Sequence, residues 1–188
     1  MARPTAAAAL AACAAVLLLF AGQSVAILFP FGAFFPVDYV PPTVRIFISD
    51  KLSLNVAVYD HGDNTQIWWK IPPLPSLIDG EGDKYWLVNV ATRQAMTSPT
   101  GNGQQVQLAE FNPFDSKGLQ LWVPSPPRPQ DAGFYQIQPN TDDDSALAGL
   151  FDGGDDVVHD GMEIGINSST PVTSNNLWMT LNVIPYPS

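Results

Sequence analysis

The triplets Gln66-Ile67-Trp68, Gln120-Leu121-Trp122 and Asn176-Leu177-Trp178 each place a tryptophan two residues after a side-chain amide. The tryptophans are 54 and 56 residues apart (122 − 68 and 178 − 122), and this spacing indicates a threefold repeat. Three indoles at equivalent places can meet near a pseudo-threefold axis and share one core, because each contributes a large apolar area. The amide that precedes each tryptophan is then expected to bond to local backbone.

Short runs of β-forming residues, punctuated by Asp, Asn, Gly and Pro, surround these triplets. The 188 residues include 18 prolines and 14 glycines, with 46% hydrophobic and 14% charged residues. This composition is typical of a turn-rich, all-β single domain rather than a helical bundle. The expected strands are residues 44–48, 54–59, 85–88, 105–108 and 134–137.

The repeated triplet resembles the ricin-B-type lectin repeat of the β-trefoil fold. The stretches 87–96 and 106–113 look like the second repeat of the plant Euonymus-lectin family. Residues 133–152, followed by Val157 to Gly161, look like that family's third repeat. The likeness covers about residues 43 to 185 and implies a β-trefoil domain over residues 43–188.

The resemblance also implies a site. Members of the family bind carbohydrate in a shallow pocket on the third repeat, and Asp152 matches the sugar-binding carboxylate while Asn175 and Asn176 match the amides. The family's stacking tryptophan falls at Asn167, where an aromatic ring is missing. Asn167-Ser168-Ser169 is instead the only glycosylation acceptor in the chain. The resemblance implies that the partners are glycans or glycoproteins and that the protein acts in stress or defence.

A second aromatic platform is suggested by Trp69, which directly follows Trp68. Because neighbouring residues of a strand point to opposite faces, one indole of this pair should face outward. Trp69 is therefore either a surface platform for a ligand or a side chain buried under the proline-rich segment described next.

The N-terminus predicts secretion. Residues 1–26 combine an early cation, Arg3, with an apolar centre and a small-x-small end, Ser24-Val25-Ala26, which is a signal-peptide pattern; the alternative is a retained membrane anchor. Cleavage after Ala26 would remove Cys13, the only cysteine, and leave no stable membrane insertion. Residues 27–42 alternate aromatics with prolines and are expected to run extended over the folded body, or to form an exposed tail for self-association.

Composition and spacing exclude several function classes. The formal charge of −10, with only 8 Lys and Arg, argues against nucleic acid as a partner. His61 and His159 lack the spacing of a metal pair or a hydrolase triad. Asp152, Asp156 and Glu163 depart from a calcium loop and are expected to be solvated turn residues.

No catalytic group, metal or cofactor is therefore predicted. The leading hypothesis is a secreted, non-catalytic lectin, and the alternative is a β-trefoil protein-interaction module, such as a protease inhibitor, that has lost sugar binding. The missing aromatic at Asn167 favours the alternative. A storage or structural role would need neither site.

Overall fold

The computed structural model describes residues 41–49, 51–56, 63–73, 83–115, 117–141, 144–150 and 158–183. All of them fall in one compact unit, Pro41–Ser188. The predicted signal peptide and residues 27–40 lie outside the described residues, so these two segments stay predictions.

Strands and short 3-10 helices make up the regular structure of the described residues, which contain no α-helix. In chain order the elements are β1 (Thr43–Ile48), β2 (Lys51–Asn55), η1 (Asp63–Gln66), β3 (Trp68–Ile71), β4 (Tyr85–Asn89), β5 (Gln94–Thr97), β6 (Gln104–Gln105), β7 (Gln107–Glu110), β8 (Leu121–Pro124), η2 (Pro129–Asp131), β9 (Ile137–Pro139), β10 (Ser145–Gly149), β11 (Ile164–Ser168), η3 (Ser174–Asn176) and β12 (Trp178–Asn182).

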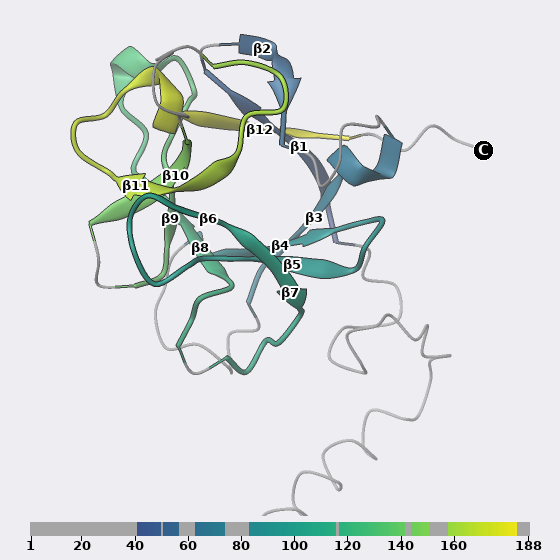
Figure 1. Ribbon diagram of the computed structural model, residues 1–188. Coiled ribbons are helices and arrows are strands. Elements are labelled where there is room, and N and C mark those ends of the chain that lie inside the picture. Colours follow the sequence, from purple (N-terminus) through teal and green to yellow (C-terminus); the bar gives the residue numbers. More distant parts are fainter. Residues whose placement is uncertain are drawn as a thin grey trace, which may run out of the picture. The chain divides into compact units, whose positions relative to one another are not determined.

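Six strands form a closed ring, in the order β12, β1, β3, β4, β8 and β9 (Figure 1). All five neighbouring pairs along this path are antiparallel. A bridge between Tyr135 and Trp178 closes the ring, with backbone hydrogen bonds of 2.9 and 2.8 Å in the two directions. The ring thus takes two strands from each predicted repeat, which leaves no open edge between the first repeat and the last.

The remaining strands form hairpins outside the ring. β2 pairs with β1, β5 lies between β4 and β7, and β10 pairs with β11 along its full length. β6 adds to the outer side of β11, so repeats two and three share one three-stranded sheet. This sheet carries the exposed Asn167 on β11.

Each predicted strand has a counterpart in the structure, but the limits of several strands differ from the predicted ones. Residues 44–48 and 85–88 lie within β1 and β4, whereas the first repeat's second strand is Lys51–Asn55 rather than 54–59. The expected strand 105–108 divides at Val106, because β6 pairs with β11 while β7 pairs with β5. β9 begins only at Ile137, because the backbone N–H and C=O of Tyr135 form the ring-closing bridge to Trp178.

The three repeat tryptophans meet in one core, as predicted. Trp68, Trp122 and Trp178 are each 1% exposed or less and belong to a single cluster of buried side chains. Each indole N–H donates to a backbone carbonyl at or just after the second strand of its own repeat: Trp68 to Val56 at 3.1 Å, Trp122 to Met96 at 3.0 Å and Trp178 to Leu147 at 2.7 Å. The indoles therefore link ring to hairpin as well as filling the core.

A polar layer of Lys70, Tyr85, Tyr135 and Thr180 borders the tryptophan core, where Tyr85 pairs with Trp122 and Tyr135 bridges to Trp178. The Tyr135 hydroxyl is 2.7 Å from the Thr180 hydroxyl, whereas the buried Tyr85 hydroxyl has no hydrogen-bond partner. The Lys70 ammonium lies 4.2 Å from the centroid of the Tyr85 ring. Burial raises the pKa of Tyr85 well above its usual value, and the nearby Tyr135 adds to the rise. Burial lowers the pKa of Lys70, an effect that Asp83 opposes.

Replacing Tyr85 by phenylalanine should stabilise the fold. A buried hydroxyl without a partner costs desolvation free energy, so Tyr85→Phe is expected to raise the free energy of unfolding by about 1 kcal/mol at neutral pH. Since the folded state holds the Tyr85 proton above the ordinary pKa of about 10, wild type loses stability as pH rises from about 10 toward the folded pKa, and the variant should lose less. Urea unfolding at neutral and alkaline pH measures both effects.

Tyr135→Phe is the matched control. It removes the hydrogen bond to Thr180 and should lower stability at neutral pH by about 1 kcal/mol. A Tyr85→Phe protein less stable than wild type at neutral pH would contradict the account of the polar layer.

Candidate functional site

The predicted third-repeat site is divided between described and undescribed residues. Asp152 lies outside the described residues, together with the rest of 151–157, so its role stays a prediction. Asn175 and Asn176 lie in η3, directly before β12, and Asn167 lies on β11. The described residues therefore form the amide side of the predicted site.

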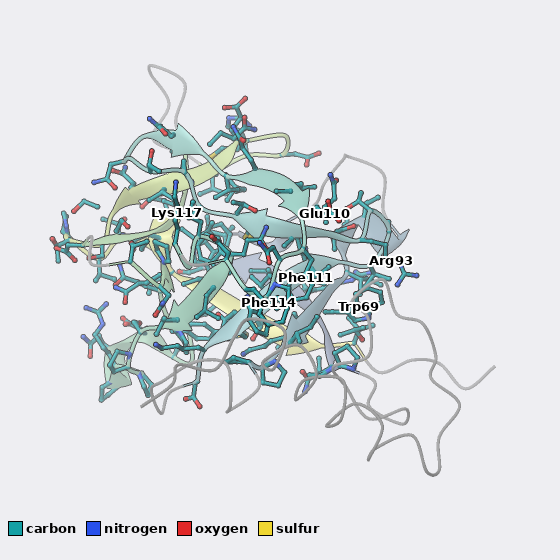
Figure 2. The ribbon with its side chains drawn as sticks, turned by 90° about the horizontal axis from the view of Figure 1, so that it is seen from below. Trp69, Arg93, Glu110, Phe111, Phe114 and Lys117 are labelled. Carbon is teal, nitrogen blue, oxygen red and sulfur yellow. The ribbon has the colours of Figure 1, made fainter. Side chains whose placement is uncertain are left out.

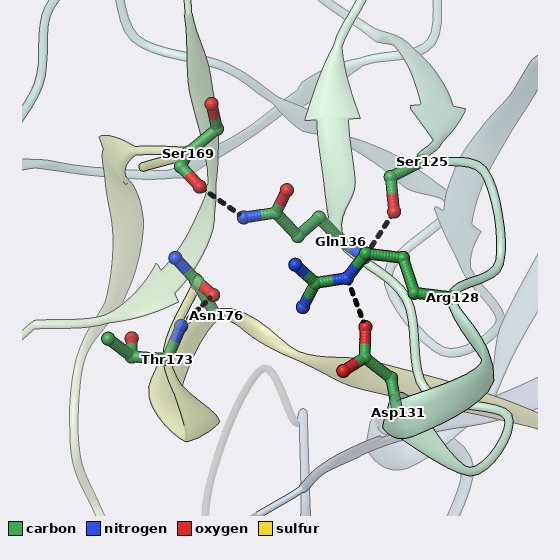
Figure 3. Close-up of polar contacts among 7 residues, drawn as sticks. All are labelled: Ser125, Arg128, Asp131, Gln136, Ser169, Thr173 and Asn176. Carbon is green, nitrogen blue, oxygen red and sulfur yellow. Dashed lines mark hydrogen bonds and ion pairs between the residues drawn. The ribbon is translucent and has the colours of Figure 1, made fainter. Parts of the chain in front are cut away.

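Asn176 fastens η3 from inside. Its side chain is 3% exposed, and its Oδ1 accepts the Thr173 N–H at 3.0 Å (Figure 3). Its Nδ2 donates to the Pro171 carbonyl at 3.3 Å. The Thr173 side chain completes a capping box, which satisfies backbone groups at the start of a helical turn. Both groups of the Asn176 amide are engaged in this cap, so a direct contact with sugar stays a prediction.

Asn175 is presented at the surface by the same turn. Its side chain is partly exposed, and its Oδ1 accepts a hydrogen bond from the Thr173 hydroxyl. The Nδ2 group is a donor that could reach a hydroxyl oxygen of a ligand. Asn176 thus holds the turn, while Asn175 is the amide that faces outward.

The loop between β11 and η3 is anchored to the rest of the third repeat. The Gln136 amide donates to the Ser169 carbonyl at 2.7 Å (Figure 3). The Ser169 and Thr170 hydroxyls donate to the Asp144 carboxylate. Asn167 itself is exposed, and its Oδ1 accepts the Ser168 N–H at 2.8 Å. The position of the missing aromatic ring is therefore at the surface, on an anchored hairpin.

The second repeat uses its amide in the same way as the third. Gln120 is 5% exposed; its Oε1 accepts the Asn112 N–H at 2.8 Å, and its Nε2 donates to the Glu110 carbonyl at 2.9 Å. The expectation that the amide of each triplet bonds local backbone is confirmed for Gln120 and Asn176. The position of Asn176 in the Asn176-Leu177-Trp178 triplet predicted its bonds to backbone. The resemblance to the lectin family predicted sugar binding for the same residue.

Trp69 does not form the exposed platform that was one of its two predicted roles. It points away from the Trp68 core but is only 7% exposed, and the Arg93 guanidinium lies 4.4 Å from the centroid of its ring (Figure 2). Burial is what the structure shows, although residues 27–40, the predicted cover, lie outside the described residues. The exposed group at this place is Arg93, which sequence reasoning missed.

Within the described ranges, no group of three or more His, Cys, Asp or Glu side chains could hold a metal ion. His159 is exposed, and its Nδ1 lies 2.9 Å from the Asp160 carbonyl oxygen. The same ranges contain no helix that is both long and apolar enough to cross a membrane.

The closed ring with its hairpins and threefold tryptophan core is the architecture of a β-trefoil, and solved structures confirm this fold class. The chain is similar to the designed threefold-symmetric protein ThreeFoil, with 15% identity, a TM-score of 0.52 and coverage of 75% of this chain and 99% of that one. It is similar to the BEL β-trefoil, with 14% identity, a TM-score of 0.53 and coverage of 78% and 98%.

A lectin is also among the similar structures. A Polyporus squamosus lectin, bound to the epitope Neu5Aca2-6Galb1-4GlcNAc, shares 11% identity with a TM-score of 0.54, over 77% of this chain and 50% of that one. Neither a protein-family model nor a curated protein matches the sequence. At these identities the likeness establishes the β-trefoil fold, whereas the Euonymus-type family remains an expectation.

The two asparagines of η3 should differ sharply in their effect on stability. Asn176→Ala leaves the Thr173 N–H and the Pro171 carbonyl without their buried partner and should lower the free energy of unfolding by about 1–3 kcal/mol. The adjacent Asn175→Ala loses a single partly exposed side-chain contact and should cost less than about 0.5 kcal/mol. Thermal and urea unfolding of both variants measure the difference, and equal costs would contradict the anchoring role of Asn176.

Proposed function

We propose that this chain is a secreted, non-catalytic carbohydrate-binding protein of the lectin type. Its partners would be glycans or glycoproteins outside the cell or in the secretory pathway, and its resemblance to the Euonymus-type family suggests a role in plant stress or defence. The observation that carries the proposal is a β-trefoil whose third repeat holds Asn175 at the surface on an anchored turn.

The site would bind a sugar through hydrogen bonds rather than through stacking. Asp152 would accept two sugar hydroxyl protons, and the Asn175 amide would fix the orientation of the ring. Asn176 would act mainly by holding η3 in place, since its amide is already engaged. A site without an aromatic platform is expected to be weak, because stacking supplies about 1 kcal/mol beyond area burial.

Glycosylation of Asn167 is part of the proposal. Its exposed side chain on β11 leaves room for a glycan, and the acceptor triplet would be read during secretion. A glycan at this position would stand where the family has its stacking ring. It would therefore restrict access to the third-repeat site.

The second candidate function is a protein-interaction module. Asn167 in place of an aromatic residue is the observation that favours it, because the fold can persist after sugar affinity is lost. The same anchored loops would then present a surface to a protein such as a protease.

A glycan array probed with protein purified from the culture medium tests the proposal. The secreted chain should begin at Ile27, as intact mass and N-terminal sequencing would show. Asp152→Ala should weaken binding to the preferred glycan by about tenfold to hundredfold, the effect of losing charge-assisted hydrogen bonds of about 1.5–3 kcal/mol. Asn175→Ala should weaken it less, and Asn167→Gln should strengthen it by removing the attached glycan.

Two control variants complete the experiment. Asp83→Ala and Gln107→Ala remove an exposed carboxylate and an exposed amide outside the third repeat and should leave binding unchanged. Binding that survives in Asp152→Ala would place the site elsewhere. No binding by any form, including the unglycosylated one, would reject the lectin function in favour of the protein-interaction module.

A further inference from the structure

Arg93 occupies an unusual backbone position. Its φ is +64°, and among the described non-glycine residues only Arg93 and Ala132 have positive φ. This left-handed region favours glycine, so a long side chain there persists only where the surroundings impose it. Residues in such conformations are concentrated at binding and active sites.

The turn between β4 and β5 imposes this conformation. The Arg93 N–H donates to the Asn89 carbonyl at 2.9 Å. The buried Asn89 side chain accepts the N–H groups of Ala91 and Thr92, each at 3.1 Å. The turn is thus closed by its own hydrogen bonds, with Arg93 at its end.

The first repeat fixes the same turn from the other side. The Asn89 Nδ2 group donates to the Thr65 carbonyl at 2.8 Å, and the Val90 N–H donates to the Ile67 carbonyl at 3.0 Å. Arg93 therefore projects from a braced junction between the first two repeats. A side chain on such a junction is preorganised and loses little entropy on binding.

The Arg93 guanidinium is stacked and available. One face lies over the Trp69 ring at 4.4 Å from its centroid, while the residue as a whole is exposed. The only ion pair among the described residues joins Arg128 to Asp131, so Arg93 has no described carboxylate partner. A stacked guanidinium keeps its N–H edges free and matches two carboxylate oxygens at once.

We propose that Arg93, held over Trp69, binds the carboxylate of an acidic saccharide, at a site separate from the third repeat. Two parallel N–H donors of the guanidinium would meet the two oxygens of a sugar-acid carboxylate. The choice of a saccharide rests on the proposed lectin function, whereas the position of the anion site does not. Glu110 lies on β7, opposite Gln94, the residue that directly follows Arg93, and its negative charge opposes the ligand.

Titration with a linear trimer of galacturonic acid, and with its fully methyl-esterified form, tests this site at low ionic strength. The wild-type protein should bind the acid at least tenfold more tightly than the ester, because only the acid carries carboxylates. Arg93→Gly should weaken binding of the acid at least tenfold while keeping the Tm near the wild-type value, since relief of the positive φ offsets the lost stack. Arg93→Asn, which also tolerates this φ, should give the same loss.

Three matched variants control for backbone, charge and local field. Ala132→Gly changes the other described positive-φ residue, and Arg128→Gln removes another arginine; both should bind the acid as wild type does. Glu110→Gln should bind the acid more tightly, because it removes a negative charge that repels the ligand carboxylate. A salt titration should weaken the wild-type interaction and leave that of Arg93→Gly nearly unchanged.

Each remaining outcome has a fixed meaning. Equal affinity for acid and ester, or equal binding by wild type and Arg93→Gly, would overturn the proposal. A hexaglutamate peptide that binds as tightly as the sugar acid, and with the same dependence on Arg93, would overturn its saccharide part. Arg93→Gly should keep any neutral-glycan binding that depends on Asp152, so failure of this site and failure of the third-repeat site are distinguishable.

Discussion

The hydrogen bonds from three indoles to three strand carbonyls are the constraint on which the rest of the structure depends. Trp68, Trp122 and Trp178 each lie at the first or second residue of a ring strand and reach the hairpin of their own repeat. A phenylalanine would fill much of the same space but would leave a buried carbonyl unpaired. Because the three contacts are equivalent, the pseudo-threefold arrangement follows from a short motif used three times, and hairpins of different length can be attached to one ring.

Much of this architecture could be predicted from the triplets. Their spacing predicted three repeats and one shared tryptophan core, and the structure confirms both. The predicted bond from the amide to local backbone is confirmed for Gln120 and Asn176. Strand limits were harder to predict, because they depend on partners distant in sequence. The division at Val106 reflects two different neighbouring strands, and the late start of β9 reflects the Tyr135–Trp178 bridge. No local pattern of side chains carries that information.

The polar groups of the site could be predicted in type but only partly in role. Asn175 and Asn176 are neighbours in sequence, yet η3 turns one outward and uses the other as a cap. Sequence reasoning also found Trp69 without finding what covers it, because the guanidinium arrives from a turn whose conformation depends on Asn89 and on the first repeat. The presence of an amide or an indole can thus be read from the sequence, whereas tertiary contacts determine which of its groups stay exposed.

The pairing of β1 with β12 has a consequence for synthesis. Val44 lies opposite Asn182. The edge of β1 that pairs with β12 therefore stays uncovered until nearly the last described residues have been synthesised. Contacts of such large sequence separation slow folding, and during translation the growing chain carries an unpaired strand edge that can join another chain. Crowding during synthesis would therefore act on the nascent chain at this edge, and the exposure ends only when the last strand, β12, has emerged and paired.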